Sequence, residues 1–161
     1  MDYIWTPWRY QYMQEATTGK QPECIFCDAL ARNNDAETLV VHRGAEAFVI
    51  LNRFPYTSGH VMIVPYVHVA DLHLCGAETL GEMMRLAQRV EKVLLENYKP
   101  DGMNLGMNLG RAAGAGVVGH LHLHALPRWM GDSNFMTVAG ETRVLAEDLA
   151  ITYDRFRKAL A

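Results

Sequence analysis

The sequence predicts a single α+β domain built on an antiparallel sheet, with one long amphipathic helix and a second helix near the C-terminus. Short β-prone segments follow one another without regular strand–helix alternation, which favours antiparallel pairing. A chain of 161 residues, half of them hydrophobic, can also bury a core of useful size. We therefore expect one domain over residues 1–161, with an aromatic extension and linker (1–23), a core (24–130), and a loop followed by the C-terminal helix (131–161).

The strands are predicted from short apolar runs bounded by glycine or proline. Three such runs lie at residues 39–41, 47–51 and 61–64. A tandem repeat, Met-Asn-Leu-Gly twice over residues 103–110, alternates in polarity as a strand does. Residues 121–126 alternate in the same way and complete the predicted sheet.

The helices are predicted from a change of period. Apolar residues recur at three- and four-residue spacing over residues 78–97, and Pro100 and Gly102 follow as stop signals. A further helix is expected over residues 145–160.

Composition argues against several classes of protein. The formal net charge of −3 is unlike that of a protein binding bulk nucleic acid, which needs a basic surface. No apolar run approaches the roughly 18 residues of a membrane span, and the acidic, aromatic start is no signal peptide. Three cysteines do not make a disulfide framework, so we expect a cytoplasmic protein with neither membrane nor nucleic-acid partner.

Histidines alternate with leucines in His120-Leu121-His122-Leu123-His124, which places the three imidazoles on one strand face. This pattern has three interpretations. It can be an ordinary polar face, or a catalytic metal site of three imidazoles. It can also supply a nucleophile, because neutral imidazole, with an ordinary pKa of roughly 6.5, attacks phosphorus well near pH 7.

A glycine-rich stretch before the histidines favours the third interpretation. Its glycines permit positive φ and let backbone N–H groups approach phosphate oxygens; they are Gly110, Gly114, Gly116 and Gly119. Residues 114–119 also fit the spacing G-x-G-x-x-G, but a dinucleotide-binding fold needs a helix after these glycines. Because a strand follows instead, we reject a Rossmann fold.

Cys24 and Cys27 have the spacing of half a zinc site. A thioredoxin-like redox motif is disfavoured, because no βαβ pattern surrounds the pair. Cys75 is expected to be a small buried residue.

The run from His120 to Leu126 resembles the signature of the histidine-triad (HIT) family. Residues 52–65 resemble the central hairpin of that family, and Asn108 with the glycines resembles its phosphate loop. The opening Trp5-Thr6-Pro7-Trp8-Arg9 and the segment Pro127-Arg128-Trp129 resemble the bacterial branch that includes dinucleoside-polyphosphate phosphorylases. One departure is that no Ser or Thr lies just before the triad.

The resemblance implies roles for individual residues. His122 would be the nucleophile that forms a nucleotidyl-histidine intermediate, His124 would bind the α-phosphate, and His60 would be a fourth histidine near the site. Asn52 would contact ribose, although a turn-capping role fits its surroundings equally well. The phosphate contacts would come from Asn108, Gly114 and Gly116, and Trp129 is a candidate for closing the substrate site.

The resemblance also implies a closed structural zinc site of Cys24, Cys27, His68 and His120, and a homodimer. The expected activity is nucleotidyl transfer or hydrolysis on nucleoside 5′-phosphate derivatives such as diadenosine polyphosphates. Phosphorolysis is slightly favoured over hydrolysis, with Arg111 or Arg128 as the cation for a phosphate acceptor. The alternatives are a nucleotide-binding or sensing protein without turnover, and a metalloenzyme that uses the three triad histidines as ligands.

Overall fold

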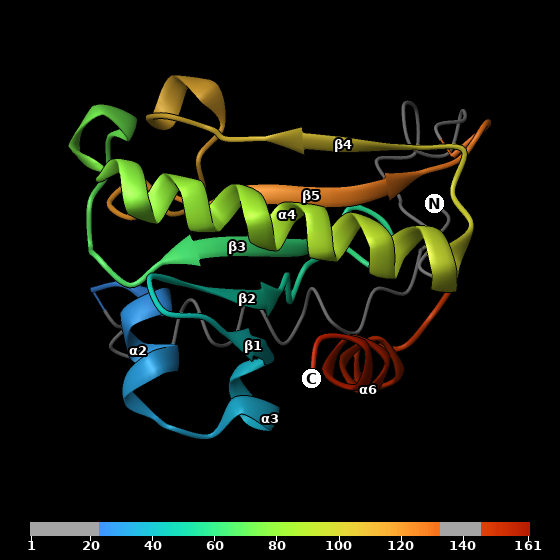
Figure 1. Ribbon diagram of the computed structural model, residues 1–161. Coiled ribbons are helices and arrows are strands. Elements are labelled where there is room, and N and C mark those ends of the chain that lie inside the picture. Colours follow the sequence, from blue (N-terminus) through green and yellow to red (C-terminus); the bar gives the residue numbers. More distant parts are fainter. Residues whose placement is uncertain (1–22, 133–145) are drawn as a thin grey trace, which may run out of the picture.

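The computed structural model describes residues 23–132 and 146–161 and contains one antiparallel sheet (Figure 1). The strand order is β1-β2-β3-β5-β4, and each neighbouring pair is antiparallel. The predicted α+β class is therefore confirmed. The strands are β1 (Val40–Arg43), β2 (Ala47–Leu51), β3 (Val61–Pro65), β4 (Gly102–Gly106) and β5 (Leu123–Arg128).

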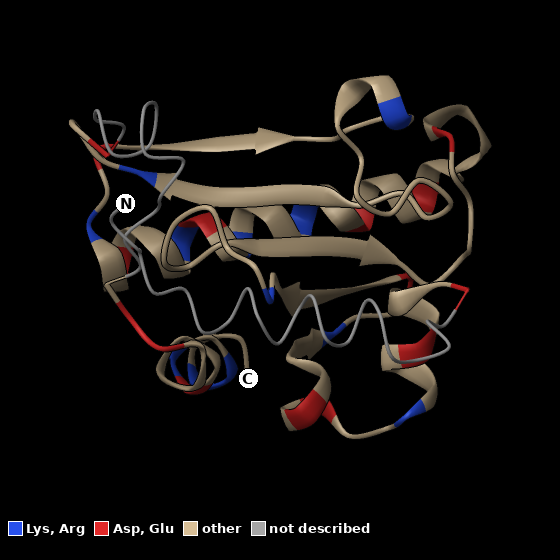
Figure 2. Ribbon diagram, turned by 180° about the vertical axis from the view of Figure 1, so that it is seen from behind, with Lys and Arg blue, Asp and Glu red and all other residues tan. Residues whose placement is uncertain are grey.

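The long predicted helix lies across one face of this sheet (Figure 1). It is α4 (Ala77–Tyr98), which extends the predicted range of 78–97 by one residue at each end. Figure 2 shows the molecule from the side opposite to this view. The remaining elements are α2 (Ile25–Ala31), α3 (Asp35–Thr38), α6 (Leu149–Ala159) and the 3-10 turns η1 (Leu72–Leu74) and η2 (Arg111–Ala113).

The sheet is buried on both faces at its centre, where every residue of β2 and β3 is buried. Alternate side chains of these strands belong to two separate apolar clusters. One cluster lies between the sheet and α4 and α6, and includes Val49, Ile63 and Phe156. The other lies beneath α2 on the opposite face and includes Phe26 and Met62.

A polar cluster anchors the segment before α6 to the end of α4. The carboxylate of Glu147 accepts hydrogen bonds from the hydroxyls of Tyr98 and Thr152, at 2.5 and 2.8 Å, and pairs with Arg155 at 2.6 Å. Although burial raises the pKa of Glu147, these hydrogen bonds and the arginine hold it below its ordinary value. Burial and the bond to Glu147 raise the pKa of Tyr98 to about 12.

Three predicted boundaries are corrected by the structure. The last strand runs over 123–128 rather than 121–126, because the amide of Leu121 bonds to the carbonyl of Val69 at 2.6 Å, outside the sheet ladder. Only the first copy of the tandem repeat is strand, and the chain turns at Gly110, where φ is 80°. The C-terminal helix starts at Leu149, where Asp148 caps it.

Two predicted segments lie outside the described residues. They are the aromatic N-terminal extension and most of the loop predicted to begin at residue 131. In the part of the chain that is described, no helix is both long enough and apolar enough to cross a membrane.

Candidate active site and metal centre

The three histidines enter the sheet at the start of β5, on the face opposite α4. His124 is paired with Met62 of the α2-side cluster, whereas Leu123 and Ala125 belong to the α4-side core. His120 and His122 precede the strand and are 1% and 5% exposed, so they do not form the solvated polar face considered above. Their burial indicates that each imidazole has a specific partner.

The Nδ1 atom of His122 lies 2.8 Å from the carbonyl oxygen of His120. A carbonyl can only accept, so Nδ1 carries the proton and the Nε2 atom of the neutral ring keeps its lone pair. Burial lowers the pKa of His122, and the bond to the carbonyl opposes this only partly. The ring is therefore neutral near pH 7, and its lone pair is on Nε2.

His124 and His60 form a second pair beside His122. The Nε2 atom of His60 lies 2.9 Å from Nδ1 of His124, and the rings of His122 and His124 are 4.9 Å apart between centroids. Burial, with a smaller effect of His122, lowers the pKa of His124 to about 4. The ring of Tyr56 lies beside both members of the pair, with centroid separations of 4.6 Å from His60 and 6.0 Å from His124.

Asn52 directly follows β2, at the end of its pairing with β3, and its side chain lies beside His60. Its Nδ2 atom lies 3.3 Å from Nδ1 of His60, and its Oδ1 accepts the amide of Phe54 at 2.9 Å. The structure thus brings together Asn52, His60, His122 and His124 from the β2–β3 turn and the start of β5.

The predicted phosphate loop leads directly into the triad. Gly110 and Gly114 have φ of 80° and 87°, as expected for glycines that shape a loop, but Gly116 and Gly119 do not have positive φ. Asn108 is half-buried at the start of this loop, and Gly116 is exposed. The ligand role of Asn108, Gly114 and Gly116 stays a prediction.

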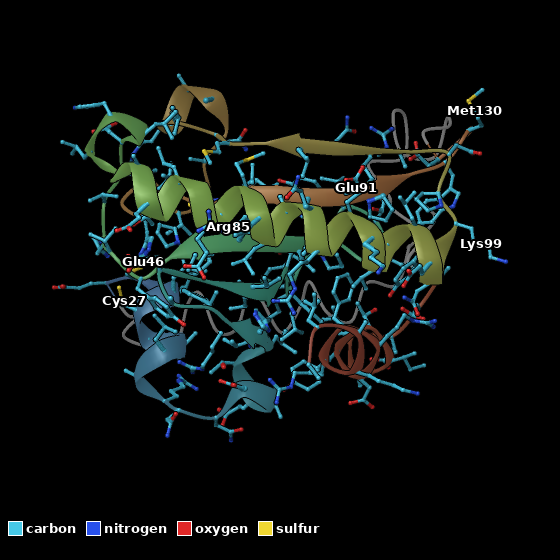
Figure 3. The ribbon with its side chains drawn as sticks, viewed as in Figure 1. Cys27, Glu46, Arg85, Glu91, Lys99 and Met130 are labelled. Carbon is cyan, nitrogen blue, oxygen red and sulfur yellow. The ribbon has the colours of Figure 1, made fainter. Side chains whose placement is uncertain are left out.

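Two other predicted residues, Arg128 and Trp129, lie at the opposite end of β5. Figure 3 shows Cys27 at one end of the molecule and Met130, the neighbour of Trp129, at the other. Arg128 pairs with Asp132 at 2.6 Å and donates to Asn104 at 2.6 Å, so its guanidinium is already engaged. Arg111, in contrast, is exposed in η2 within the glycine-rich loop.

A second cluster lies where α2 meets the segment before β5. The ligand atoms of Cys24, Cys27, His68 and His120 are all within 4.8 Å of one another. The three sulfur–Nδ1 distances are 3.2, 3.3 and 3.7 Å. A tetrahedral zinc with bonds of about 2.0–2.3 Å needs ligand separations of about 3.3–3.8 Å, so the geometry fits such an ion.

The orientation of His120 supports the same conclusion. Its Nε2 atom lies 2.9 Å from the carbonyl oxygen of Pro65, which directs the lone pair of Nδ1 at the two thiols. Burial lowers the pKa of His120, so its ring is neutral, as a ligand must be. Within residues 23–132 and 146–161 this is the only group of three or more ligand-type residues close enough to hold a metal. This finding disfavours the metalloenzyme built on three triad imidazoles.

Two residues near the histidines were absent from the sequence predictions. Phe26 lies between the two cysteines in the sequence and is fully buried. It packs against the rings of His120 and His122, with centroid separations of 5.4 and 5.2 Å. Tyr56 lies in the β2–β3 turn. A single aromatic residue in a turn or in a C-x-x-C motif carries no periodic signal, so only the packing identifies either one.

This sheet, with a buried histidine row at the start of an inner strand, defines a domain of the histidine-triad type. Residues 33–130 match the HIT domain. The chain is 37% identical over 154 residues to the AP-4-A phosphorylase of Mycobacterium tuberculosis strain H37Rv, covering 92% of this chain and 79% of that protein. The chain belongs to the HIT family.

Solved structures agree with this assignment. A Zn-bound histidine triad family protein from Mycobacterium smegmatis superposes with a TM-score of 0.69 at 30% identity, covering 85% of this chain and 92% of the other. A hypothetical histidine triad nucleotide-binding protein from Sulfolobus tokodaii superposes with a TM-score of 0.68 at 27% identity, covering 85% and 91%.

Proposed function

We propose that this protein transfers or hydrolyses the nucleotidyl group of nucleoside 5′-phosphate derivatives through His122. The observation that carries the proposal is the bond from Nδ1 of His122 to the carbonyl of His120, at 2.8 Å, which leaves a lone pair on Nε2. Nε2 attacks the α-phosphorus and forms a P–N bond, while the P–O bond to the leaving phosphate breaks. Water or inorganic phosphate then attacks the same phosphorus, which breaks the P–N bond to His122 and releases the nucleotide.

Other residues bind and orient the substrate in this proposal. His124 donates from Nε2 to an oxygen of the α-phosphate, and Asn52 contacts the ribose. Asn108, Gly114 and Gly116 hold the phosphates, because amide and backbone N–H donors suit anionic oxygens. Trp129 closes the substrate site.

Diadenosine polyphosphate is the proposed substrate and inorganic phosphate the favoured acceptor, supported by the similarity to an AP-4-A phosphorylase. The exposed Arg111 in the phosphate loop is the candidate cation for the acceptor, because Arg128 is engaged by Asp132. Product analysis with diadenosine tetraphosphate tests this. Phosphorolysis gives ATP plus ADP and requires added phosphate, whereas ATP plus AMP formed at the same rate without phosphate would establish a hydrolase.

Zinc is proposed as the structural ion of the second cluster. Cys24, Cys27, His68 and His120 would hold it, and the Zn-bound relative from M. smegmatis supports the choice. Four protein ligands leave no open position, so the ion would stabilise the fold around His120 and take no part in the chemistry.

A homodimer and a cytoplasmic location complete the proposal. The edge strand β4 is largely exposed and offers backbone groups for pairing with a second chain. None of the three cysteines forms a disulfide, in keeping with a reducing compartment. Light scattering at micromolar concentration measures the mass of the assembly.

His122→Asn tests the nucleophile. Loss of a nucleophile removes several orders of magnitude of turnover in other enzymes, and we expect the same loss here with nucleotide binding retained in calorimetry. Turnover close to that of the native protein would refute the role of His122. Binding by the native protein with no turnover would instead favour a sensing protein.

A further inference from the structure

The two cysteines of the C-x-x-C motif lie one helical turn apart at the start of α2. Cys24 is the N-cap residue, with extended backbone angles, and Cys27 lies in the first turn. The amide of Asp28 donates to the carbonyl of Cys24 at 3.0 Å, so this turn has helical geometry. Such a turn separates the two Cα atoms by about 5 Å, and a disulfide spans roughly 4.4–6.8 Å between Cα atoms. The backbone therefore permits a bond between the two sulfurs.

The two sulfurs differ in their access to solvent. Cys24 is 6% exposed, and its sulfur faces His120, which is 1% exposed. Cys27 is only partly buried and lies at one end of the molecule (Figure 3), where its sulfur is 3.2 Å from Nδ1 of the exposed His68. A small oxidant from solvent therefore meets the sulfur of Cys27 first, with the protected sulfur of Cys24 within 4.8 Å of it.

The third cysteine has a different position. Cys75 directly follows η1 and is 7% exposed. It does not belong to the group of ligand atoms that lie within 4.8 Å of one another. Cys24 is therefore the thiol that is placed to react with an oxidised Cys27.

We propose that Cys24 and Cys27 form a peroxide-sensitive dithiol, which closes a reversible disulfide and so removes both anionic ligands from the metal site. Formation of the disulfide depends on the protein alone, and only the release of an ion rests on the proposed zinc site. Disulfides in a reducing compartment are usually transient and catalytic or redox-sensing. This role differs from that of a thioredoxin-like oxidoreductase, because the oxidant is a hydroperoxide and no protein disulfide is reduced.

The reaction has two steps, with hydrogen peroxide as the oxidant. The thiolate of Cys27 attacks one peroxide oxygen, which breaks the O–O bond, forms a sulfenic acid and releases hydroxide. The thiolate of Cys24 then attacks the sulfur of Cys27, which forms the S–S bond and releases a second hydroxide. Two thiolates are thus oxidised by two electrons in total, and one peroxide is reduced. Because the thiolate is the form of cysteine that binds metal, only His68 and His120 remain as ligands.

The direct test uses the full chain, purified in the reduced form with its metal. After treatment with equimolar hydrogen peroxide, alkylation and peptide mass spectrometry should find Cys24 joined to Cys27, and Cys75 alkylated. A chromogenic chelator should detect one zinc ion released for each disulfide, and dithiothreitol followed by zinc should restore both thiols and the bound ion. The inference would be overturned if both thiols remain alkylatable in excess peroxide, or if Cys27 proceeds to a sulfinic acid without forming a disulfide.

The order of the two steps is tested by trapping the intermediate. Dimedone, which reacts with sulfenic acids, should label Cys27 and leave Cys24 unlabelled when it is present during oxidation of the native protein. In the variants, Cys24→Ser should be labelled at Cys27, and Cys27→Ser should react about tenfold more slowly because its remaining thiol at position 24 is buried. Cys75→Ser is the matched control and should form the disulfide as the native protein does. Labelling of native Cys24 rather than Cys27 would refute the assigned order.

Metal analysis before oxidation separates this inference from the proposed metal site. If the purified protein holds no zinc, the proposed metal site fails, whereas a disulfide between positions 24 and 27 formed by peroxide still supports the dithiol. If zinc is bound and peroxide leaves both thiols intact, the dithiol inference fails and the metal site stands.

Discussion

Replacing Phe26 by leucine should affect the proposed nucleophile, His122, and the fold to different degrees. Phe26 is fully buried and packs on His122 at 5.2 Å between ring centroids. Loss of about three carbon atoms, at about 0.8 kcal/mol for each buried methylene, lowers the free energy of unfolding by about 2 kcal/mol. For a chain of this size that corresponds to a fall in Tm of about 4–8 °C. A nucleophile released to move by about 1 Å can lose 100-fold in rate, so we expect kcat to fall by about 10- to 100-fold.

Phe48→Leu is the matched control. Phe48 is also fully buried in the α2-side cluster, but it stacks on Tyr66 at 5.6 Å. Both variants should lose similar stability in urea unfolding, and only Phe26→Leu should lose activity in steady-state assays. Metal content, measured by mass spectrometry, should be unchanged in both. If kcat of Phe26→Leu stays within twofold of the native value, Phe26 does not position His122.

Further predictions concern the metal, pH and backbone. Cys24→Ser should lower zinc content and Tm by several degrees, because structural zinc contributes on the order of 10 kcal/mol in small zinc-finger peptides; zinc-free native protein would contradict this. The depressed pKa of Glu147 means that its stabilisation is present at neutral pH and lost as pH falls below its ordinary value. Glu147→Gln should therefore cost about 1–2 kcal/mol in urea unfolding at pH 7 and less in acid, with the exposed Glu91→Gln as control. Gly59→Ala should cost about 1–2 kcal/mol because φ is +85°, whereas Gly102→Ala, with open space around it, should be nearly neutral in the same assay.

The regular parts of the fold could be predicted because their signals are periodic. The apolar spacing of α4 and the alternation in β5 both report which side chains face the core. The end of β4 could not be predicted, since the two copies of Met-Asn-Leu-Gly are identical and only tertiary pairing with β5 distinguishes them. The start of β5 was misplaced for a similar reason, because the partner of Leu121 is a loop carbonyl.

The proposed metal ligands illustrate what a family resemblance adds to residue patterns. The spacing of Cys24 and Cys27 indicates half of a site, but nothing local in the sequence points to His68, which is 41 residues from Cys27. The resemblance supplied that residue, and the structure brings it to the cluster. The tautomers of the histidines, by contrast, depend on backbone groups, such as the carbonyl of His120, that look alike in every sequence.

His120 belongs to both centres through different parts of one residue. Its side chain faces the cysteines, whereas its main-chain oxygen accepts the hydrogen bond from Nδ1 of His122, the proposed nucleophile. A main-chain oxygen is present whatever side chain occupies the position. Relatives could therefore exchange or abandon the metal ligands and still keep the protonation pattern of the nucleophile, provided that the local path of the chain is preserved. The proposed metal site and the proposed nucleophile could therefore change independently during evolution, although both involve His120 in this protein.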